Sequence, residues 1–276
     1  MRYTNRWIWL SLFVALLSGC IEPAEREVVV YTALDREFSE AVFEQFTRET
    51  GIAVRAKYDV ESTKTVGLAE AILRERARPR CDLFWNNEIL HTLRLQDAGI
   101  LAAYAAPRAA HYPAMYRAPD GAWHGFAARA RVLIVNRDLV AREQFPQSIR
   151  DLADPRWRGQ VGLAKPLFGT TATHAACLFA VWGDDPAREF FEQLKSNCQI
   201  LAGNKQVAVS VAAGRLAFGL TDTDDAMVEI SRGGPVEIVY PDQQPDAMGT
   251  LFIPNTLGLI QGGPHGDDAR RLVDFL

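Results

Sequence analysis

Acidic side chains are crowded at one point of the sequence, directly after a predicted strand. Asp222, Asp224 and Asp225 follow the apolar segment 217–220. Carboxylates this close together need a cation between them or a raised pKa. A metal ion or the ammonium group of a bound molecule would serve as that cation. For Asp224 alone, the alternative is that it caps a helix that runs to Ser231.

Two other segments have the composition of anion sites. Segments 168–171 and 61–65 each follow a predicted strand and open a predicted helix. Helix N-termini carry unpaired backbone N–H groups and a partial positive charge, so they attract anions. The alternative is that their hydroxyl side chains serve only as helix caps. The residues predicted to bind anionic oxygens are Gly169, Thr170, Thr171, Thr63 and Lys64.

Polar residues also mark the end of another predicted strand, 81–85. Open α/β sheets place ligand contacts at the carboxyl ends of their parallel strands. Trp85, Asn86 and Asn87 stand at that end, and the asparagine amides can both donate and accept hydrogen bonds. We predict that all three contact the ligand, although Trp85 could equally be a half-buried aromatic side chain.

Two arginines alternate along a further strand. Arg129 and Arg131 have the same parity, so an extended chain places both on one side. A guanidinium there could bind an anion through two hydrogen bonds. A structural ion pair is the alternative for either one, and Arg129 is included among the predicted ligand contacts.

The elements that position these residues follow a repeated strand–helix order. Apolar β-branched segments predict buried strands, and apolar residues at spacings of three and four predict helices. The predicted strands are 27–32, 52–58, 81–85, 132–135, 161–164, 217–220 and 249–260, and the helices include 62–77, 170–182, 186–197, 205–213 and 267–276. Phe38, Val42 and Phe46 indicate one more helix, capped by Asp35 or Ser39 and ended by Gly51. Two such α/β sets in one chain predict two lobes.

No Pro/Gly/Ser linker separates the two sets, so we expect extended hinge strands near 127–132 and 248–254. The predicted lobe 1 comprises residues 20–127 and 250–276, and lobe 2 comprises residues 128–249. The sequence stops within the last predicted helix without a cap, so we expect a C-terminal region to be missing.

The N-terminus predicts export. Arg2 and Arg6 precede an apolar run, 7–17, that is much shorter than the ~20 residues of a transmembrane helix. Leu-Ser-Gly-Cys follows and ends at Cys20, which resembles a bacterial lipobox. We therefore predict a signal peptide over residues 1–19 and a lipid anchor on Cys20. No other long apolar run follows it.

Charge and cysteines narrow the classes of partner. The chain carries 30 basic and 34 acidic residues, with no Lys/Arg-rich run of the kind that nucleic acid requires. The spacing of Cys81, Cys177 and Cys198 is not that of a zinc site. Cys177 and Cys198 could pair in an oxidising compartment, or all three could be buried small residues. The histidines are scattered and no nucleophile motif occurs, so we predict a non-enzyme without cofactor or metal.

Several segments, taken in order, resemble the periplasmic ferric-ion-binding protein family of ABC-transporter solute receptors. The match runs from about Val28 to the end of the chain, through VVVYTALDREFSEAVFEQFTRETGI, CDLFWNNE, ARARVLIVNRDL, LADPRWRGQVGLA and GNKQVAVSVAAGRLAFGL. The resemblance implies an α/β fold of the two-lobed type II periplasmic-binding-protein class, with a hinge between the lobes. It also implies a ligand in the interlobe cleft and a membrane permease as partner.

The departures from that family concern the metal site. Iron-binding members use two adjacent tyrosines, whose places fall on Asp224 and Asp225, and some add a His and a Glu, whose places fall on Asp35 and about Asn87. The resemblance thus adds Asp35 to the predicted site, but the phenolates that favour Fe(III) are missing.

We therefore predict a periplasmic, lipid-anchored and monomeric receptor of an ABC importer. Its predicted solute is small and charged, with a phosphonate or phosphate end and an amine end, such as 2-aminoethylphosphonate. A ferric-iron receptor is the alternative, and a secreted enzyme is a remote one.

Overall fold

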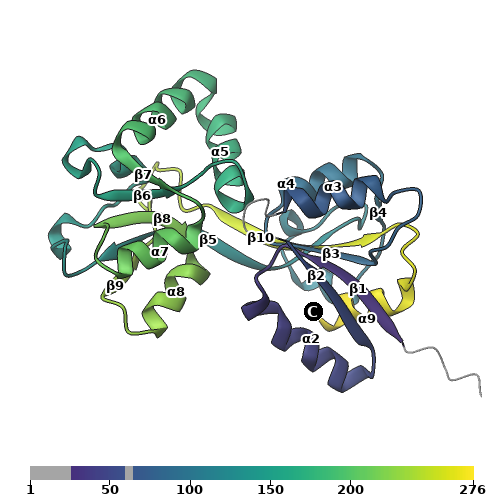
Figure 1. The fold of residues 1–276 in the computed structure, drawn as a ribbon. Helices are drawn as coiled ribbons and strands as arrows, with labels where there is room; N and C mark the ends of the chain where they lie inside the picture. The colour runs from purple at the N-terminus through teal and green to yellow at the C-terminus, as the bar shows by residue number, and fades with distance from the viewer. Residues whose placement is uncertain (1–25, 60–64) are drawn as a thin grey trace, which may run out of the picture.

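The computed structural model describes residues 26–59 and 65–276, which form two α/β lobes joined through a shared pair of strands (Figure 1). Cys20, Thr63 and Lys64 lie outside the described residues, as does the predicted signal peptide. Among the described helices, none combines the length and apolar character needed to span a membrane.

Lobe 1 is built on β1, β2, β3, β4 and β10. Its strands are β1 (Glu27–Thr32), β2 (Ala53–Tyr58), β3 (Leu83–Asn86), β4 (Leu101–Ala102) and β10 (Phe252–Ile260). Its helices are α2 (Arg36–Thr50), α3 (Val66–Arg74), α4 (Leu90–Asp97) and α9 (Gly266–Phe275), with short 3-10 turns at Pro107–His111 and Ala114–Tyr116. Helices α2 and α9 pack on one face of the sheet, whereas α3 and α4 pack on the other.

Lobe 2 is built on β6, β7, β8 and β9. Its strands are β6 (Val161–Ala164), β7 (Cys198–Leu201), β8 (Phe218–Asp222) and β9 (Val236–Val239). Its helices are α5 (Gly169–Trp182), α6 (Asp184–Asn197), α7 (Asn204–Ala212) and α8 (Thr223–Ser231), with 3-10 turns at Arg142–Gln144, Ile149–Ala153 and Pro155–Trp157. Core residues lie on both faces of this sheet, against α5 and α6 on one side and α7 and α8 on the other.

Strand β5 (His124–Asn136) runs through both lobes and changes its partner between them. Up to Ala130 it pairs antiparallel with β10, and from Arg131 onward it pairs with β8. This change of partner falls within the segment 127–132, for which a hinge strand is predicted. The two-lobed α/β fold with a hinge is therefore confirmed, whereas the lobe boundaries at 127/128 and 249/250 remain predictions.

The local signals account for most elements but miss the short or irregular ones. Phe43 and Phe46 of α2 are buried, and the helix ends at Gly51 with φ 72°, a conformation that glycine adopts without strain. Strands β4, β7 and β9 are not predicted, because short strands lack a clear periodicity. Strand β5 begins three residues before the predicted hinge strand. The predicted strand 249–260 was too long, since β10 begins at Phe252.

The predicted caps and the possible disulfide also need correction. Asp35 occupies the N-cap position of α2, but its side chain makes no capping hydrogen bond. Asp222, not Asp224, occupies the N-cap position of α8. Cys81, Cys177 and Cys198 are all free, so the pairing of Cys177 with Cys198 is not formed.

Strands β6 and β8 approach each other closely at a pair of glycines. Gly162 and Gly219 face each other in the parallel ladder. A Cβ on Gly219 would lie 2.5 Å from Val207 Cγ1 and 2.9 Å from the Gly162 carbonyl oxygen. Gly219→Ala should therefore lower the free energy of unfolding by roughly 1–3 kcal/mol through overpacking.

Thermal unfolding measures this loss. Gly266→Ala is the matched control, because nothing lies within 4 Å of its new Cβ. A Gly219→Ala variant as stable as the control would contradict the close contact.

Candidate functional site

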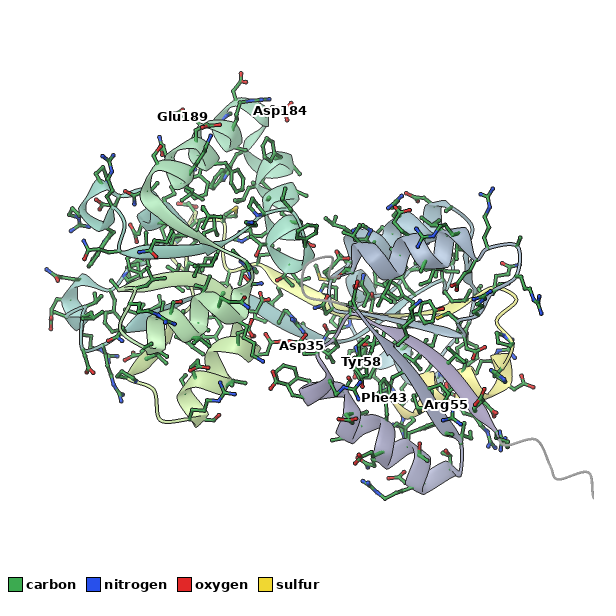
Figure 2. All side chains as sticks on the ribbon, viewed as in Figure 1. Asp35, Phe43, Arg55, Tyr58, Asp184 and Glu189 are labelled. Atoms are coloured by element: carbon green, nitrogen blue, oxygen red, sulfur yellow. The ribbon has the colours of Figure 1, made fainter. Side chains whose placement is uncertain are left out.

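A cleft between the lobes gathers charged side chains from both of them. Lobe 1 contributes Asp35 and Asn87, β5 contributes Arg129, and lobe 2 contributes the rest of the lining. Figure 2 shows Asp35 on the side of lobe 1 that faces lobe 2, whereas Asp184 and Glu189 lie at the far end of lobe 2. The lobe 2 lining consists of Ala164, Lys165, Phe168, Gly169, Thr170, Thr171, Ala202, Gly203, Asn204, Lys205, Asp222, Asp224 and Asp225.

Most of the described residues predicted as ligand contacts line this cleft. They are Asp35, Asn87, Arg129, Gly169, Thr170, Thr171, Asp222, Asp224 and Asp225. Asn87 is oriented by Thr65, whose hydroxyl donates to the Asn87 side-chain oxygen at 3.3 Å. Sequence segments separated by almost two hundred positions thus meet at one place.

Trp85 and Asn86 do not line the cleft, which corrects their predicted role. The Trp85 ring packs edge-to-face against Phe43 and Phe126, with ring centroids 5.3 and 5.1 Å apart. The Asn86 amide donates to Glu88 at 2.9 Å and to Thr92 at 3.0 Å. Both side chains are buried in lobe 1, because β3 is a central strand with both faces covered.

A buried ion pair lies at the lobe 2 end of the cleft. Arg131 is fully buried, and its Nη1 contacts Asp222 Oδ1 at 2.6 Å. The same guanidinium lies 3.3 Å from the hydroxyls of both Thr170 and Thr171. The parity argument is thus consistent with the structure, and Arg131 makes the structural ion pair that was its alternative role.

Asp222 joins this pair to the first turns of two helices. Its Oδ2 accepts hydrogen bonds from the Thr170 hydroxyl of α5 at 2.6 Å and from the Asn204 amide of α7 at 3.0 Å. Asn204 in turn accepts from the Thr171 hydroxyl at 3.0 Å. The ends of β8, α5 and α7 are therefore held together by one carboxylate.

This network changes how an anion could bind at α5. The hydroxyl protons of Thr170 and Thr171 are donated to Asp222 and Asn204, so they are not available to a ligand. The backbone N–H groups of the first turn have no acceptor within the helix. We therefore replace the prediction of hydroxyl contacts with one of backbone contacts from Gly169, Thr170 and Thr171.

The charges around Asp222 decide its ionisation. Burial disfavours the carboxylate, but the Arg131 and Arg129 guanidiniums and the Thr170 hydrogen bond outweigh it and hold the pKa of Asp222 below its ordinary value. His174 lies nearby on α5, where burial and the charge of Arg131 lower its pKa to about 3. His174 is therefore neutral at neutral pH and is not a cationic anion-binding group.

Asp224 and Arg129 form a second pair at the cleft, and this pair is incompletely bonded. Arg129 Nη1 lies 3.1 Å from Asp224 Oδ2 and 3.8 Å from Asp222 Oδ2. Among the described residues, neither Asp224 Oδ1 nor Arg129 Nε has a hydrogen-bond partner, although both atoms are buried. Burial raises the pKa of Asp224, while the Arg129 charge opposes that rise.

The acidic cluster has the spacing of a metal site, but several of its ligand atoms already have partners. Asp222, Asp224 and Asp225 each offer a carboxylate oxygen within 4.8 Å of the others. Both oxygens of Asp222 are already occupied, and Asp224 faces the positive charge of Arg129. A metal ion would have to displace these contacts.

Some cleft residues were missed by the sequence argument. Gly203, Asn204 and Lys205 open α7 directly after the short strand β7, which is the same strand-to-helix arrangement as at α5. Because strand β7 is not predicted from the sequence, the strand-to-helix arrangement at the start of α7 was not recognised. Lys165 also lines the cleft, directly after β6.

Besides the contacts of Arg129, polar side chains of the described residues connect the lobes at the starts of two helices. The Lys205 ammonium of α7 lies 2.8 Å from Glu37 of α2, and this pair is solvent-exposed. The Thr173 hydroxyl of α5 donates at 3.0 Å to Glu88, a buried carboxylate that also accepts from the backbone N–H groups at the start of α4. Lobe 1 therefore contacts the starts of both α5 and α7.

The buried pair generates a prediction about stability. Arg131→Met leaves the buried Asp222 without its nearest counter-charge, so the free energy of unfolding should fall by roughly 3–5 kcal/mol at neutral pH. The lowered pKa of Asp222 means that its ionised form contributes stability above the ordinary pKa of aspartate, and this contribution is lost as pH falls through the folded-state pKa. The difference between wild type and variant should therefore narrow on acidification.

Thermal unfolding across a pH series tests this dependence. Arg156→Met is the control, because Arg156 pairs with Asp154 on the surface and should contribute little. A deficit in Arg131→Met that stays constant down to acid pH would show that the charge of Asp222 is not its cause.

Comparison with known proteins places this geometry in context. The family model described as bacterial extracellular solute-binding protein matches residues 87–276. The Fe(3+)-binding periplasmic protein of Serratia marcescens is 26% identical over 197 residues, which cover 71% of this chain and 57% of that protein. The major ferric iron-binding protein of Neisseria meningitidis is 26% identical over 280 residues, covering 96% of this chain and 81% of that protein.

A protein of Salmonella typhimurium that is proposed to bind 2-aminoethylphosphonate in the periplasm is 23% identical over 282 residues, covering 99% of this chain and 79% of that protein. Among solved structures, iron-bound HitA from Pseudomonas aeruginosa superposes with a TM-score of 0.82 at 24% identity, covering 91% of this chain and 80% of that one. AfuA from Actinobacillus pleuropneumoniae, with fructose-6-phosphate bound, gives 0.78 at 20% identity, covering 91% and 79%. These structures share the fold.

Proposed function

The chain belongs to the bacterial extracellular solute-binding protein family, the receptors of ABC importers, and we propose that it captures a small solute with both an anionic and a cationic group. The proposed anionic group is a phosphonate or phosphate, and the proposed cationic group is an amine. 2-Aminoethylphosphonate is the simplest molecule of this kind. The interlobe cleft is the proposed binding site.

The observation that carries this proposal is the incompletely bonded pair of Arg129 and Asp224. A buried donor or acceptor without a partner costs free energy, about 1–3 kcal/mol for a neutral group and more for a charged one. Among the described residues, Arg129 Nε is such a donor and Asp224 Oδ1 is such an acceptor, and both residues line the cleft. A solute that satisfies both atoms must present an acceptor and a donor together.

The rest of the lining supports the anionic half of the solute. The first turns of α5 and α7 both reach the cleft through Gly169 and Gly203. Backbone N–H groups and the helix dipole favour an anion at each of them. Lys165 adds a positive charge to the same lining. A phosphonate offers enough oxygens to accept hydrogen bonds from both helices.

The acidic side chains support the cationic half. Asp224 lies in the first turn of α8, and Asp35 lines the cleft from lobe 1. Negative charges from both lobes around one small cleft favour a ligand with an ammonium group. The relative in Salmonella typhimurium that is proposed to bind 2-aminoethylphosphonate is consistent with this solute class.

Ferric iron is the second candidate, favoured by the spacing of the three carboxylates. Several relatives are named as ferric iron-binding proteins. Against it stand the guanidinium of Arg129 beside Asp224 and the absence of tyrosine at 224 and 225. Metal analysis of the purified protein separates the two candidates, because a carboxylate-only iron site need not be coloured.

Cellular placement and partners are part of the proposal. We propose that Cys20 carries a lipid that anchors a monomeric receptor outside the cytoplasmic membrane. The proposed partner is an ABC permease of the inner membrane, to which the loaded receptor presents its solute. The relatives are transport proteins, which favours solute binding over catalysis.

Calorimetric titration with 2-aminoethylphosphonate, inorganic phosphate and ferric citrate tests the solute. We expect saturable binding of 2-aminoethylphosphonate, and a loss of affinity of roughly 10- to 100-fold in Arg129→Met, because a charged hydrogen bond contributes about 1.5–3 kcal/mol. Arg142→Met is the control, since it removes the same charge from a side chain that is 77% exposed and pairs with Glu237. No heat with the phosphonate, or stoichiometric iron in the purified protein, would refute the proposed solute.

A further inference from the structure

Asp222 and Asp224 lie two positions apart, but their carboxylates are bonded in different ways. Asp222 Oδ1 accepts from Arg131, and Asp222 Oδ2 accepts from Thr170 and Asn204. The side chain of Asp222 is 2% exposed. These hydrogen-bond partners belong to lobe 2 or to the part of β5 that pairs with it, and Arg129 Nη1 lies farther away, 3.8 Å from Oδ2. No oxygen of Asp222 is left without a bond.

Asp224 has the opposite arrangement. Its side chain is 23% exposed and lines the cleft, Oδ2 pairs with Arg129, and Oδ1 has no hydrogen-bond partner among the described residues. Arg129, which is 7% exposed, holds a second unsatisfied atom, Nε, at the same place. The two carboxylates are thus neighbours that share contact with Arg129. They differ in that both oxygens of Asp222 are hydrogen-bonded within lobe 2, although Arg131 Nε is itself without a partner among the described residues, whereas Asp224 Oδ1 faces the cleft without one.

We infer that these two carboxylates have separate roles: Asp222 is a positioning residue that sets the starts of α5 and α7, whereas Asp224 determines specificity by contacting the cationic group of the solute. The assignment to Asp224 rests on the proposed function. The assignment to Asp222 does not, because its bonds are internal to the protein.

The two roles predict opposite effects on the stability of the ligand-free protein. Removing the charge of Asp222 leaves Arg131 buried without a partner of opposite charge in contact among residues 26–59 and 65–276, which is destabilising. Removing the charge of Asp224 relieves a partly buried carboxylate with one unsatisfied oxygen. Arg129 then keeps Asp222 at 3.8 Å and the side-chain oxygen of Asn255 at 3.5 Å.

The direction of each pKa supports this contrast. The pKa of Asp222 lies below its ordinary value, so folding favours its ionised form. The pKa of Asp224 lies above its ordinary value, so the stability that its protonated form contributes at low pH is lost as pH rises through the folded-state pKa. At neutral pH, Asp224 therefore has a cost to the fold, as is common for residues kept for binding.

The roles also predict different effects on ligand choice. Asp222 positions the starts of α5 and α7. Its replacement should therefore lower the affinity of the cleft for every anion to the same degree. Replacement of Asp224 should lower the affinity only for a ligand that carries a cationic group. Ethylphosphonate lacks the amine of 2-aminoethylphosphonate and is otherwise of similar shape, so the ratio of the two affinities isolates this contact.

The experiment compares Asp222→Asn and Asp224→Asn, which keep the side-chain shape and remove the charge. Thermal unfolding without ligand gives the first readout, and calorimetry with 2-aminoethylphosphonate and ethylphosphonate gives the second. For Asp222→Asn we expect a Tm lower by about 5 °C or more and about tenfold weaker binding of both phosphonates.

For Asp224→Asn we expect an equal or higher Tm, about tenfold weaker binding of 2-aminoethylphosphonate and unchanged binding of ethylphosphonate. Thr170→Val supplies a milder version of the Asp222 change, because it removes one hydroxyl from the network without stranding a charge. Thr170→Val should lower the affinity for both phosphonates equally. It therefore tests the positioning role even if Asp222→Asn does not fold.

Two results would overturn the inference. A Tm lowered by Asp224→Asn as much as by Asp222→Asn would make both residues structural. A preference for 2-aminoethylphosphonate that Asp224→Asn leaves intact would remove its role in specificity. If the wild type binds neither phosphonate, the proposed solute is wrong, while the two Tm values still decide whether the carboxylates differ.

Discussion

The buried guanidinium of Arg131 is the constraint on which the geometry of the cleft depends. An arginine with no exposed surface requires a counter-charge and hydrogen-bond acceptors around it. Asp222 supplies the charge and thereby fixes the end of β8 against β5. Because Thr170 and Asn204 bond to the same carboxylate, the starts of α5 and α7 are fixed as well. The backbone N–H groups at the starts of α5 and α7 are therefore positioned by the Arg131–Asp222 ion pair at the end of β8.

The second arginine stands on the other side of the partner change in β5. Arg129 pairs with the β10 side of the strand and reaches both Asn255 and Asp224, whereas the contacts of Arg131 stay within lobe 2. A rotation of the lobes about this strand would alter the surroundings of Arg129 and leave the Arg131 network intact. The exposed pair of Lys205 and Glu37 contributes little to holding the lobes together. A solute that satisfies Arg129 can thus bias closure by its differential contacts.

The sequence predicted most of the longer elements in their order, because buried parallel strands and amphipathic helices leave strong periodic patterns, but it missed β4, α4, β7 and β9. It also predicted Asn87 and the acidic cluster as ligand contacts, since open α/β sheets place such contacts at the ends of their strands, and these residues line one cleft. Asp35 was added by the family resemblance and Arg129 by its position on the hinge strand, and both line the same cleft. It could not show which polar groups satisfy one another. Thr170 meets Asp222 across 52 positions, and this contact alone decides that its hydroxyl is unavailable to a ligand. Trp85 was misplaced for a similar reason, because the partners that bury it are far away in sequence.

The charge arrangement supports the proposed zwitterionic solute over a trivalent metal. The described carboxylates Asp222 and Asp224 are each matched by an arginine, so these four residues are electrically neutral together. Fe(III) beside Asp224 would bring three positive charges close to the Arg129 guanidinium, a repulsion that a partly buried site screens poorly. A zwitterion avoids this repulsion, because its anionic group can pair with Arg129 while its ammonium group pairs with Asp224. One ion pair is then replaced by two without any change in net charge. The neutrality of the Arg129–Asp224 pair also explains why both side chains can be largely buried in the absence of a solute.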